Sequence, residues 1–252
     1  MYPQRIVCLT EESVETLYLL GLQDRIVGVS CFVERPVEAK QKEVVTSFTN
    51  SNIEKIIKLK PDLVLGYSDI QKDIAKTLIG EGLDVWISNH KSIEEILRYI
   101  NMLGGMLGVQ EKAEILSSSI SNKIQSLDKT NKFRCYIEEW DEPIIVGSKW
   151  FSEVIELAGG KDIYKDYALK PLAKDRIVDI SRISDLDPEF IFLCWCGKKV
   201  NLDKVYKRPE FFETRAYKNK KIFELDPSIF LQPGPAPLLD GIDIIQRIFN
   251  SK

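Results

Sequence analysis

The chain of 252 residues contains one histidine, five cysteines and no long hydrophobic run. Because His90 is the single histidine, a metal site built from several histidines is excluded, and imidazole acid–base chemistry would depend on this residue alone. The cysteines form no regular framework, which predicts mostly free thiols and weakly favours a reducing compartment. The uncharged apolar runs have the length of strands, far short of the ~20 residues that a spanning helix needs.

The beginning of the sequence also lacks the pattern of a secretion signal. The segment MYPQRIVCL has no charged start, no long apolar stretch and no small-residue cleavage site. The sequence therefore predicts either a cytosolic protein or a mature form whose leader has been removed. The 35 basic residues are spread among 38 acidic ones, for a net charge of -3, so we expect no nucleic-acid partner.

Motifs of common enzymes are absent as well. The sequence contains no glycine-rich dinucleotide motif after its first strand, no phosphate-binding loop, no nucleophile elbow and no H-E-x-x-H. Three candidates for chemistry remain. We expect His90 to be a half-exposed surface group, the acidic loop 138–142 to be solvated, and the sulfurs of Cys194 and Cys196 to point to one face of a strand. Such a cysteine pair suits a soft metal, but buried cysteines are also common.

Strands alternate with helices along the chain. Expected strands lie at 5–9, 25–30, 63–67, 84–88, 135–140, 189–195 and 221–225, and expected helices at 11–20, 51–60, 69–80, 93–107, 110–128, 149–158, 179–186 and 237–250. Such alternation predicts the α/β class, with parallel sheets covered by helices.

An internal repeat predicts two similar halves. The segment NIEKIIKLKPDLVL at 52–65 resembles DISRISDLDPEFIF at 179–192, with Pro61 matching Pro188. An acidic residue follows the proline in both segments. Any helix–proline–strand unit has this general pattern, but a second echo, LYLLGLQDRI against IELAGGKDIY, occurs in the same order and favours a repeat.

The repeat predicts an α/β fold of two Rossmann-like lobes with a ligand cleft between them, because ligands often bind between lobes. We expect an N-terminal lobe at 1–108, a spine helix at 109–129 and a C-terminal lobe at 130–252. At 1.5 Å per residue the helix at 110–128 would be roughly 30 Å long, which suits a rigid spine better than a flexible linker.

Aromatic residues gather at the ends of the expected strands or in the loops that follow them. Ligands of α/β sheets bind outside the carboxyl ends of the strands, and flat rings stack on planar ligands. Each single aromatic residue is more often part of a core. Six of them together predict a large, partly flat ligand: Phe32, Tyr67, Trp140, Trp150, Trp195 and Phe230.

Several stretches resemble the cobalamin- and siderophore-type substrate-binding proteins of ABC importers. They are RIVCLTEESVETLYLLGLQDRIVGVS at 5–30, SNIEKIIKLKPDLVLGY at 51–67, YIEEWDEPIIVGSKWFSEVIELAGGKDIY at 136–164 and LQPGPAPLLDGIDII at 231–245. The resemblance covers nearly the whole chain in order. It is therefore specific for the family and less specific for the ligand.

The resemblance implies a monomer outside the cytoplasm that holds a corrinoid or ferric chelate and delivers it to the permease of an ABC importer. Phe32 and Tyr67 stand where relatives carry cleft aromatics, and the segment from Trp140 to Pro143 stands at the opposite wall. We therefore expect a binding protein without resident cofactor, metal or catalytic residue. Two alternatives stay open: a cytosolic protein that handles tetrapyrroles or metal chelates, and an enzyme on the same scaffold.

Overall fold

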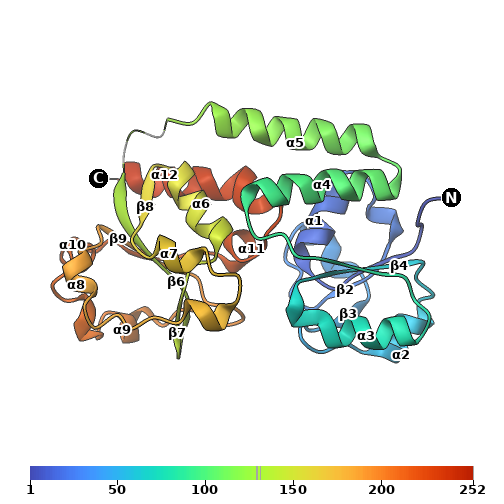
Figure 1. The fold of residues 1–252 in the computed structure, drawn as a ribbon, viewed down its shortest axis with the longest axis horizontal. Helices are drawn as coiled ribbons and strands as arrows, with labels where there is room; N and C mark the ends of the chain where they lie inside the picture. Colours follow the sequence, from blue (N-terminus) through green and yellow to red (C-terminus); the bar gives the residue numbers. More distant parts are fainter. Residues whose placement is uncertain (129, 131, 252) are drawn as a thin grey trace. The chain divides into compact units, whose positions relative to one another are not determined.

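The computed structural model describes residues 1–128, 130 and 132–251. The described chain divides into two compact units, each built around one sheet with helices packed against it (Figure 1). Unit 1 comprises Met1–His90 and Glu94–Asn122, and unit 2 comprises Lys91–Ile93 and the chain from Lys123 onward. The predicted α/β class is confirmed. The predicted division at 108 and 129 and the predicted cleft between lobes stay predictions.

The sheet of unit 1 has five parallel strands in the order β3-β2-β1-β4-β5. Because all five run in one direction, their carboxyl ends meet at one edge of the sheet. The strands are β1 (Ile6–Cys8), β2 (Ile26–Ser30), β3 (Val44–Thr46), β4 (Leu63–Tyr67) and β5 (Val85–Ser88).

Helices cover both faces of this sheet, with α2 and α3 on one face and α1 and α4 on the other (Figure 1). On α4 the buried residues recur at helical spacing, from Ile96 through Tyr99 and Leu103 to Leu107, which directs one apolar face toward the sheet. The helices are α1 (Glu11–Leu19), α2 (Ile53–Lys58), α3 (Lys72–Gly80), α4 (Ile93–Leu107) and α5 (Gln110–Gln125), with short turns η1 (Gln23–Arg25), η2 (Val37–Gln41) and η3 (Asp69–Gln71).

The close approach of α4 and α5 depends on Gly104. A Cβ atom at this position would lie 2.3 Å from the Cβ of Ala113, closer than two carbon atoms can approach. α5 covers most of the predicted spine helix. Its first residues, through Asn122, belong to unit 1 and its last ones to unit 2.

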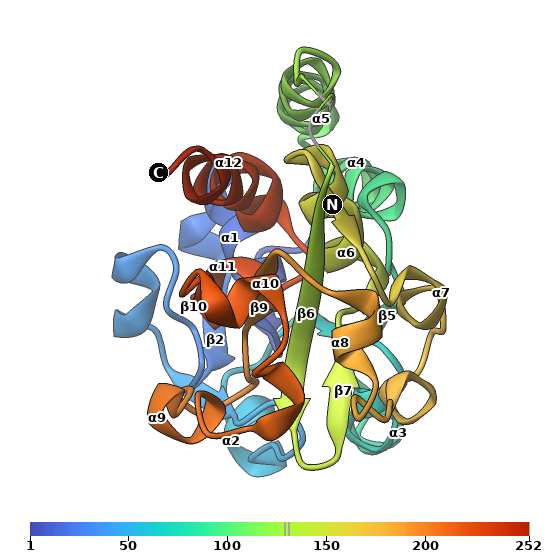
Figure 2. The ribbon, with the colours of Figure 1, turned by 90° about the vertical axis from the view of Figure 1, so that its left-hand side faces the viewer.

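The sheet of unit 2 has the order β10-β9-β6-β7, and β8 pairs with the first residues of β6. β7 is antiparallel to β6, whereas β8, β9 and β10 pair in parallel. Figure 2 shows that β6 continues past the other strands toward β7 as a two-stranded arm. The strands are β6 (Phe133–Asp141), β7 (Ile144–Val146), β8 (Gly160–Asp162), β9 (Phe190–Leu193) and β10 (Ile222–Glu224).

In the described part of unit 2, α6 and α12 flank this sheet, and shorter helices and turns connect its strands. The helices are α6 (Lys149–Leu157), α7 (Lys165–Ala168), α8 (Ile183–Leu186), α9 (Leu202–Val205), α10 (Arg215–Lys218), α11 (Pro227–Phe230) and α12 (Ile242–Asn250), with turns η4 (Ala173–Arg176) and η5 (Pro209–Phe211) and a five-residue π-helical turn η6 (Pro237–Gly241).

The two sheets share a pattern of pairing. The order β2-β1-β4-β5 in unit 1 corresponds to β8-β6-β9-β10 in unit 2, and the repeated sequence segments supply the equivalent strands β4 and β9. The residue before each proline of the repeat has a positive φ, 48° at Lys60 and 41° at Asp187. The backbone therefore turns in the same way from helix into strand in both units.

The repeated acidic residue has a structural role in both units. In unit 1 the carboxylate of Asp62 accepts a hydrogen bond from the backbone N–H of Arg5 (2.8 Å). In unit 2 Glu189 accepts the equivalent bond from the N–H of Arg134 (3.0 Å). Each carboxylate thereby joins the start of one strand to the strand beside it.

Candidate functional site

The carboxyl edge of the sheet in unit 1 gathers polar and aromatic side chains. Tyr67 ends β4 and is 7% exposed, and its ring lies 5.1 Å from that of His90. His90 stacks on Tyr99 of α4 with centroids 4.2 Å apart, and Ser88 Oγ lies 2.8 Å from His90 Nδ1. The expectation of a half-exposed histidine is wrong, because this stack buries the ring to 2% exposure.

Phe32 is the exposed aromatic residue of this edge. It follows β2, and 46% of its surface is accessible. Its backbone N–H donates to Ser30 Oγ (3.2 Å), which fixes the turn at the end of the strand. An exposed phenyl ring at a strand end is available to contact a bound molecule.

Two neighbouring acids begin α1, of which Glu11 is half-buried and Glu12 is buried. Glu12 is 2% exposed and accepts a hydrogen bond from Thr10 Oγ1, and burial raises the pKa of its carboxyl to about 8. Burial also raises the pKa of Glu11. Glu11 Oε1 is buried without a hydrogen-bond partner among the described residues. Both carboxylates lie in the first turn of α1, and the sequence gives no signal of their burial.

Acidic residues of unit 2 lie along β6 and continue into its turn, and each has a basic partner. Fully buried Glu138 accepts from Arg208 Nη1 (2.7 Å), Tyr136 Oη (2.8 Å) and Trp195 Nε1 (3.0 Å). Burial raises the pKa of the Glu138 carboxyl, and the three donors around it offset part of this effect. A solvated acidic loop was expected here, but Glu138 lies inside the sheet.

The next acids along the arm are paired in the same manner. Glu139 accepts from Arg176 Nη2 (2.8 Å) and from the backbone N–H of Ser148 (2.6 Å) at the start of α6. Asp141 pairs with Lys198, whose bond and charge outweigh burial and lower the pKa of this carboxyl.

Glu142 pairs with Lys204 (2.7 Å), which holds the pKa of Glu142 below its ordinary value. Every carboxylate in 138–142 thus forms an ion pair with a lysine or an arginine.

Aromatic side chains of the arm stack around a lysine. Lys198 Nζ lies 4.2 Å from the ring centre of half-buried Trp140 and 5.0 Å from that of Trp195. Trp140 Nε1 donates to the carbonyl of Glu142 (2.8 Å), and exposed Pro143 completes the turn into β7. Trp195, at 2% exposure, packs inside the core of unit 2.

Trp150 and Phe230 form a second aromatic contact in unit 2. Trp150 Nε1 donates to the carbonyl of Phe230 (3.1 Å), and the Phe230 ring stacks on Phe151 at 5.3 Å. With exposures of 8% and 1%, Trp150 and Phe230 pack the unit. Contact of all seven predicted residues with a ligand stays a prediction, and Phe32, Trp140 and Pro143 are the ones with accessible surface.

The cysteine pair does not form a two-sulfur face. β9 ends at Leu193, so the pair follows the strand, and Cys194 is buried whereas Cys196 is exposed. Burial raises the pKa of Cys194 far above its ordinary value, which keeps it a thiol. Among the described residues no three His, Cys, Asp or Glu side chains form a group suited to a metal ion.

A protein-family model matches most of the chain and identifies its family. Residues 6–229 match the model of the periplasmic binding protein family. The chain belongs to this family. The predicted family is thereby confirmed. An uncharacterized ABC transporter substrate-binding lipoprotein of Bacillus subtilis is 29% identical, over 96% of this chain and 78% of its own length. A vitamin B12-binding protein of Vibrio vulnificus is 28% identical, over 94% of this chain and 86% of its own.

Solved structures of the family have the same fold. The periplasmic vitamin B12-binding protein of Vibrio cholerae superposes with a TM-score of 0.74 and 25% identity, over 98% of this chain and 96% of the other. A periplasmic heme-binding protein of Pseudomonas aeruginosa gives a TM-score of 0.81 and 21% identity, over 99% and 94%. The named relatives are binding proteins rather than enzymes. Within the described residues, none of the helices has the length and apolar character needed to cross a bilayer.

Proposed function

We propose that this protein binds a corrinoid, without turnover, and delivers it to an ABC importer from outside the cytoplasm. The observation that carries the proposal is the likeness to vitamin B12-binding proteins over at least 94% of the chain. Accessible Phe32 and Trp140, both at strand ends, suit a large flat ligand.

Charge favours a corrinoid over a porphyrin. A heme carries two propionates, which need cations, but Arg176, Lys198 and Arg208 already pair with acids of the β6 arm. A corrinoid instead carries amide side chains, which donate hydrogen bonds. These amides need hydrogen-bond partners rather than cations.

The absence of turnover is supported by the pairing of the acidic residues. Carboxylates fixed by arginine or lysine at 2.7–2.8 Å are poor proton carriers, and Cys194 is held as a thiol. We therefore expect the ligand to be recovered unchanged after incubation with the protein, which chromatography of the released corrinoid would check.

A pair of matched variants tests the site. Phe32 and Phe212 are similarly exposed, at 46% and 41%, but only Phe32 lies at the carboxyl edge of a sheet. We expect Phe32→Ala to weaken cobinamide binding by ~10-fold, since a buried aromatic contact contributes about 1–2 kcal/mol. Phe212→Ala should leave binding unchanged. Equal effects of the two variants would contradict the assignment of Phe32.

A further inference from the structure

Strand β5 forms one end of the sheet in unit 1, and its outer edge has none of the usual protection against pairing. Among the described strands it pairs with β4 alone, in a continuous register from Val85 to Ser88. The sequence of the strand, VWIS, contains no charge and no proline, and all four residues are half-buried. Edge strands that avoid further pairing commonly carry a lysine, a proline or a bulge.

The other end of the same sheet is irregular. β3 pairs with β2 through a register shift between Val29 and Ser30, and the chain returns beside Thr46 through an antiparallel bridge to Ser51. A shift of this kind increases local twist and interrupts regular pairing. Of the two ends, β5 is therefore the one shaped to accept another strand.

The backbone of β5 presents hydrogen-bonding groups to this edge. The carbonyls of Asp84 and Ser88 accept from the N–H groups of Val64 (2.8 Å) and Ser68 (2.9 Å) on the β4 side. Because alternate residues of a parallel strand bond to the same neighbour, the N–H and C=O groups of Val85 and Ile87 face outward. A strand that added to this edge would satisfy them.

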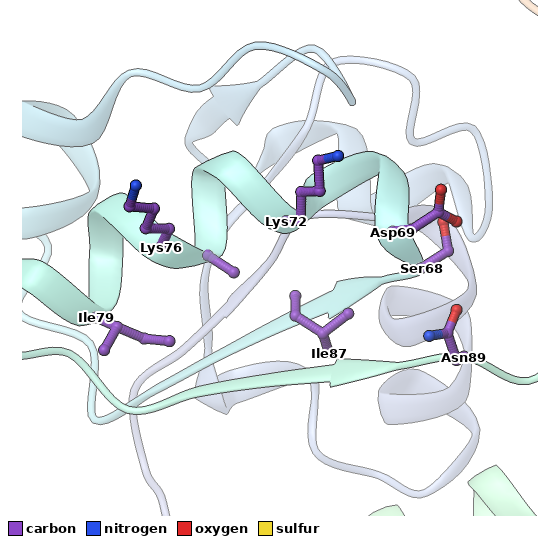
Figure 3. A pocket seen from close by; sticks show the side chains of 8 residues that line it. Ser68, Asp69, Lys72, Lys76, Ile79, Ile87 and Asn89 are labelled. Atoms are coloured by element: carbon purple, nitrogen blue, oxygen red, sulfur yellow. The ribbon is translucent and has the colours of Figure 1, made fainter.

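A hollow of about 490 Å³ lies between β5 and α3 (Figure 3). Ile87 points into it from the strand, and Ala75 and Ile79 line it from the helix. Ile79 is 59% exposed, which is unusual for a large aliphatic side chain on a helix that packs on a sheet. The hollow would receive the inward-facing apolar side chains of an added strand.

Three charged residues line the hollow, and the two lysines outnumber the single carboxylate of Asp69 (Figure 3). Lys72 and Lys76 stand one turn apart on α3 and line the hollow, and their ammonium groups project beyond it (Figure 3). Neither lysine forms an ion pair with a described residue. A second copy of the chain would bring its own pair of lysines to the same place, so self-association through this edge is opposed by charge.

We propose that the edge of β5 and its hollow, together called the β5 groove, bind an extended acidic segment of a partner protein. The segment would add to the sheet as a sixth strand, with main-chain bonds to Val85 and Ile87. Every second side chain of the segment would face α3, where apolar ones would enter the hollow and carboxylates would approach Lys72 and Lys76. This surface belongs to unit 1 alone and does not depend on the identity of the ligand.

A suitable probe is a capped synthetic peptide of ~8 residues, the length of a typical strand, in which one face carries valine and glutamate in turn and the other face carries threonine. We expect saturable binding to the full chain, with new protection of the Ile87 amide in hydrogen exchange read by NMR. The same peptide with lysine in place of glutamate should not bind. Absence of binding by the glutamate peptide, or equal binding by both peptides, would overturn the proposal.

Variants separate the groove from general charge effects. Lys76→Glu should weaken binding of the glutamate peptide by ~10-fold at low salt, with a smaller effect at high salt, because exposed charges are screened. Lys58→Glu, the same change at an exposed lysine of α2, serves as the control. Equal losses in the two variants would count against the groove.

Ile87→Pro removes one outward N–H and blocks an added strand, yet proline is tolerated at a sheet edge. We expect it to abolish peptide binding while circular dichroism and cobinamide binding stay unchanged. If Ile87→Pro does not fold, the comparison of Lys76→Glu with Lys58→Glu still tests peptide binding at the groove. If the unmodified chain instead dimerises through β5, with sedimentation that depends on concentration and reverts in Ile87→Pro, the occupant is a second copy and the proposal is wrong.

Discussion

Replacement of Glu12 by glutamine should change how the stability of unit 1 depends on pH. Glu12 is buried in the first turn of α1, and burial raises the pKa of its carboxyl from the ordinary 4.5 to about 8. Glutamine has nearly the same shape and still accepts the hydrogen bond from Thr10. The variant therefore removes the titration while it preserves packing.

The sign follows from proton linkage. Because the pKa of Glu12 is higher in the folded chain, the folded chain keeps this proton at pH values where the unfolded chain has lost it. The contribution of Glu12 to the free energy of unfolding is therefore fully present below pH 4.5 and is lost as the pH rises to about 8. Each unit of pKa shift corresponds to 1.36 kcal/mol. Between pH 6.5 and pH 8.5 the loss is therefore about 2 kcal/mol for the native chain, and Glu12→Gln should not show it.

Urea unfolding followed by circular dichroism at these two pH values measures the difference. Asp162 of unit 2 has a pKa raised by burial to about 6, so most of its contribution is lost below this window. Exposed Glu94, in the first turn of α4, supplies the control variant Glu94→Gln, which should keep the native pH dependence. Parallel pH profiles for the native chain and Glu12→Gln would refute the reasoning.

Three further predictions concern packing, charge and thiols. Gly104→Ala should lower the free energy of unfolding by about 1–3 kcal/mol, because the added carbon clashes with Ala113. Gly80→Ala is the control, since its added carbon meets open space, and it should be nearly neutral. Thermal unfolding measures both. Arg208→Ala should cost roughly 3–5 kcal/mol in urea unfolding because it leaves buried Glu138 unpaired, and a double variant with Glu138→Gln should recover part of this loss. A colorimetric thiol reagent at pH 8 should react quickly with the exposed thiols of Cys31 and Cys196. It should react with the buried thiols only after unfolding; these are Cys8, Cys135 and Cys194. Fast reaction of a third thiol in the native chain would count against the described burial.

Much of the fold follows from patterns in the sequence. The apolar run LVLGY, placed after Pro61, predicts β4 at its observed bounds, and the periodic segment 93–107 coincides with α4. The repeat around Pro61 and Pro188 corresponds to equivalent strands. These segments are long or strongly punctuated, so local pattern suffices.

Other elements depend on contacts that a local pattern does not contain. The helix expected at 179–186 begins only at Ile183, because the Asp179 carboxylate binds the N–H of Ser181 (2.8 Å) and holds a turn there. β3, β7 and β8 have three residues each, too few to show a period, and were not expected. Their pairing with longer strands defines them.

The sequence predicts which types of residue gather at the candidate site but not how exposed their side chains are. Aromatic residues at strand ends were singled out, but Trp195 and Phe230 are core residues and Phe32 is accessible. Sequence alone gives the same signal in both situations, since aromatic rings serve cores and binding surfaces equally well. The burial of Glu12 and the ion pairs of the β6 arm depend on residues far away in the chain, such as Arg208.

The most direct test of the central claim is calorimetric titration of the purified chain with cobinamide and cyanocobalamin, alongside hemin and a ferric hydroxamate. We predict that each chain binds one corrinoid with a Kd of about 1 μM or lower, at least ~10-fold below the Kd for hemin, and that the corrinoid is recovered unchanged. Preference for hemin or the hydroxamate, no binding of either corrinoid, or conversion of the ligand during incubation would contradict it.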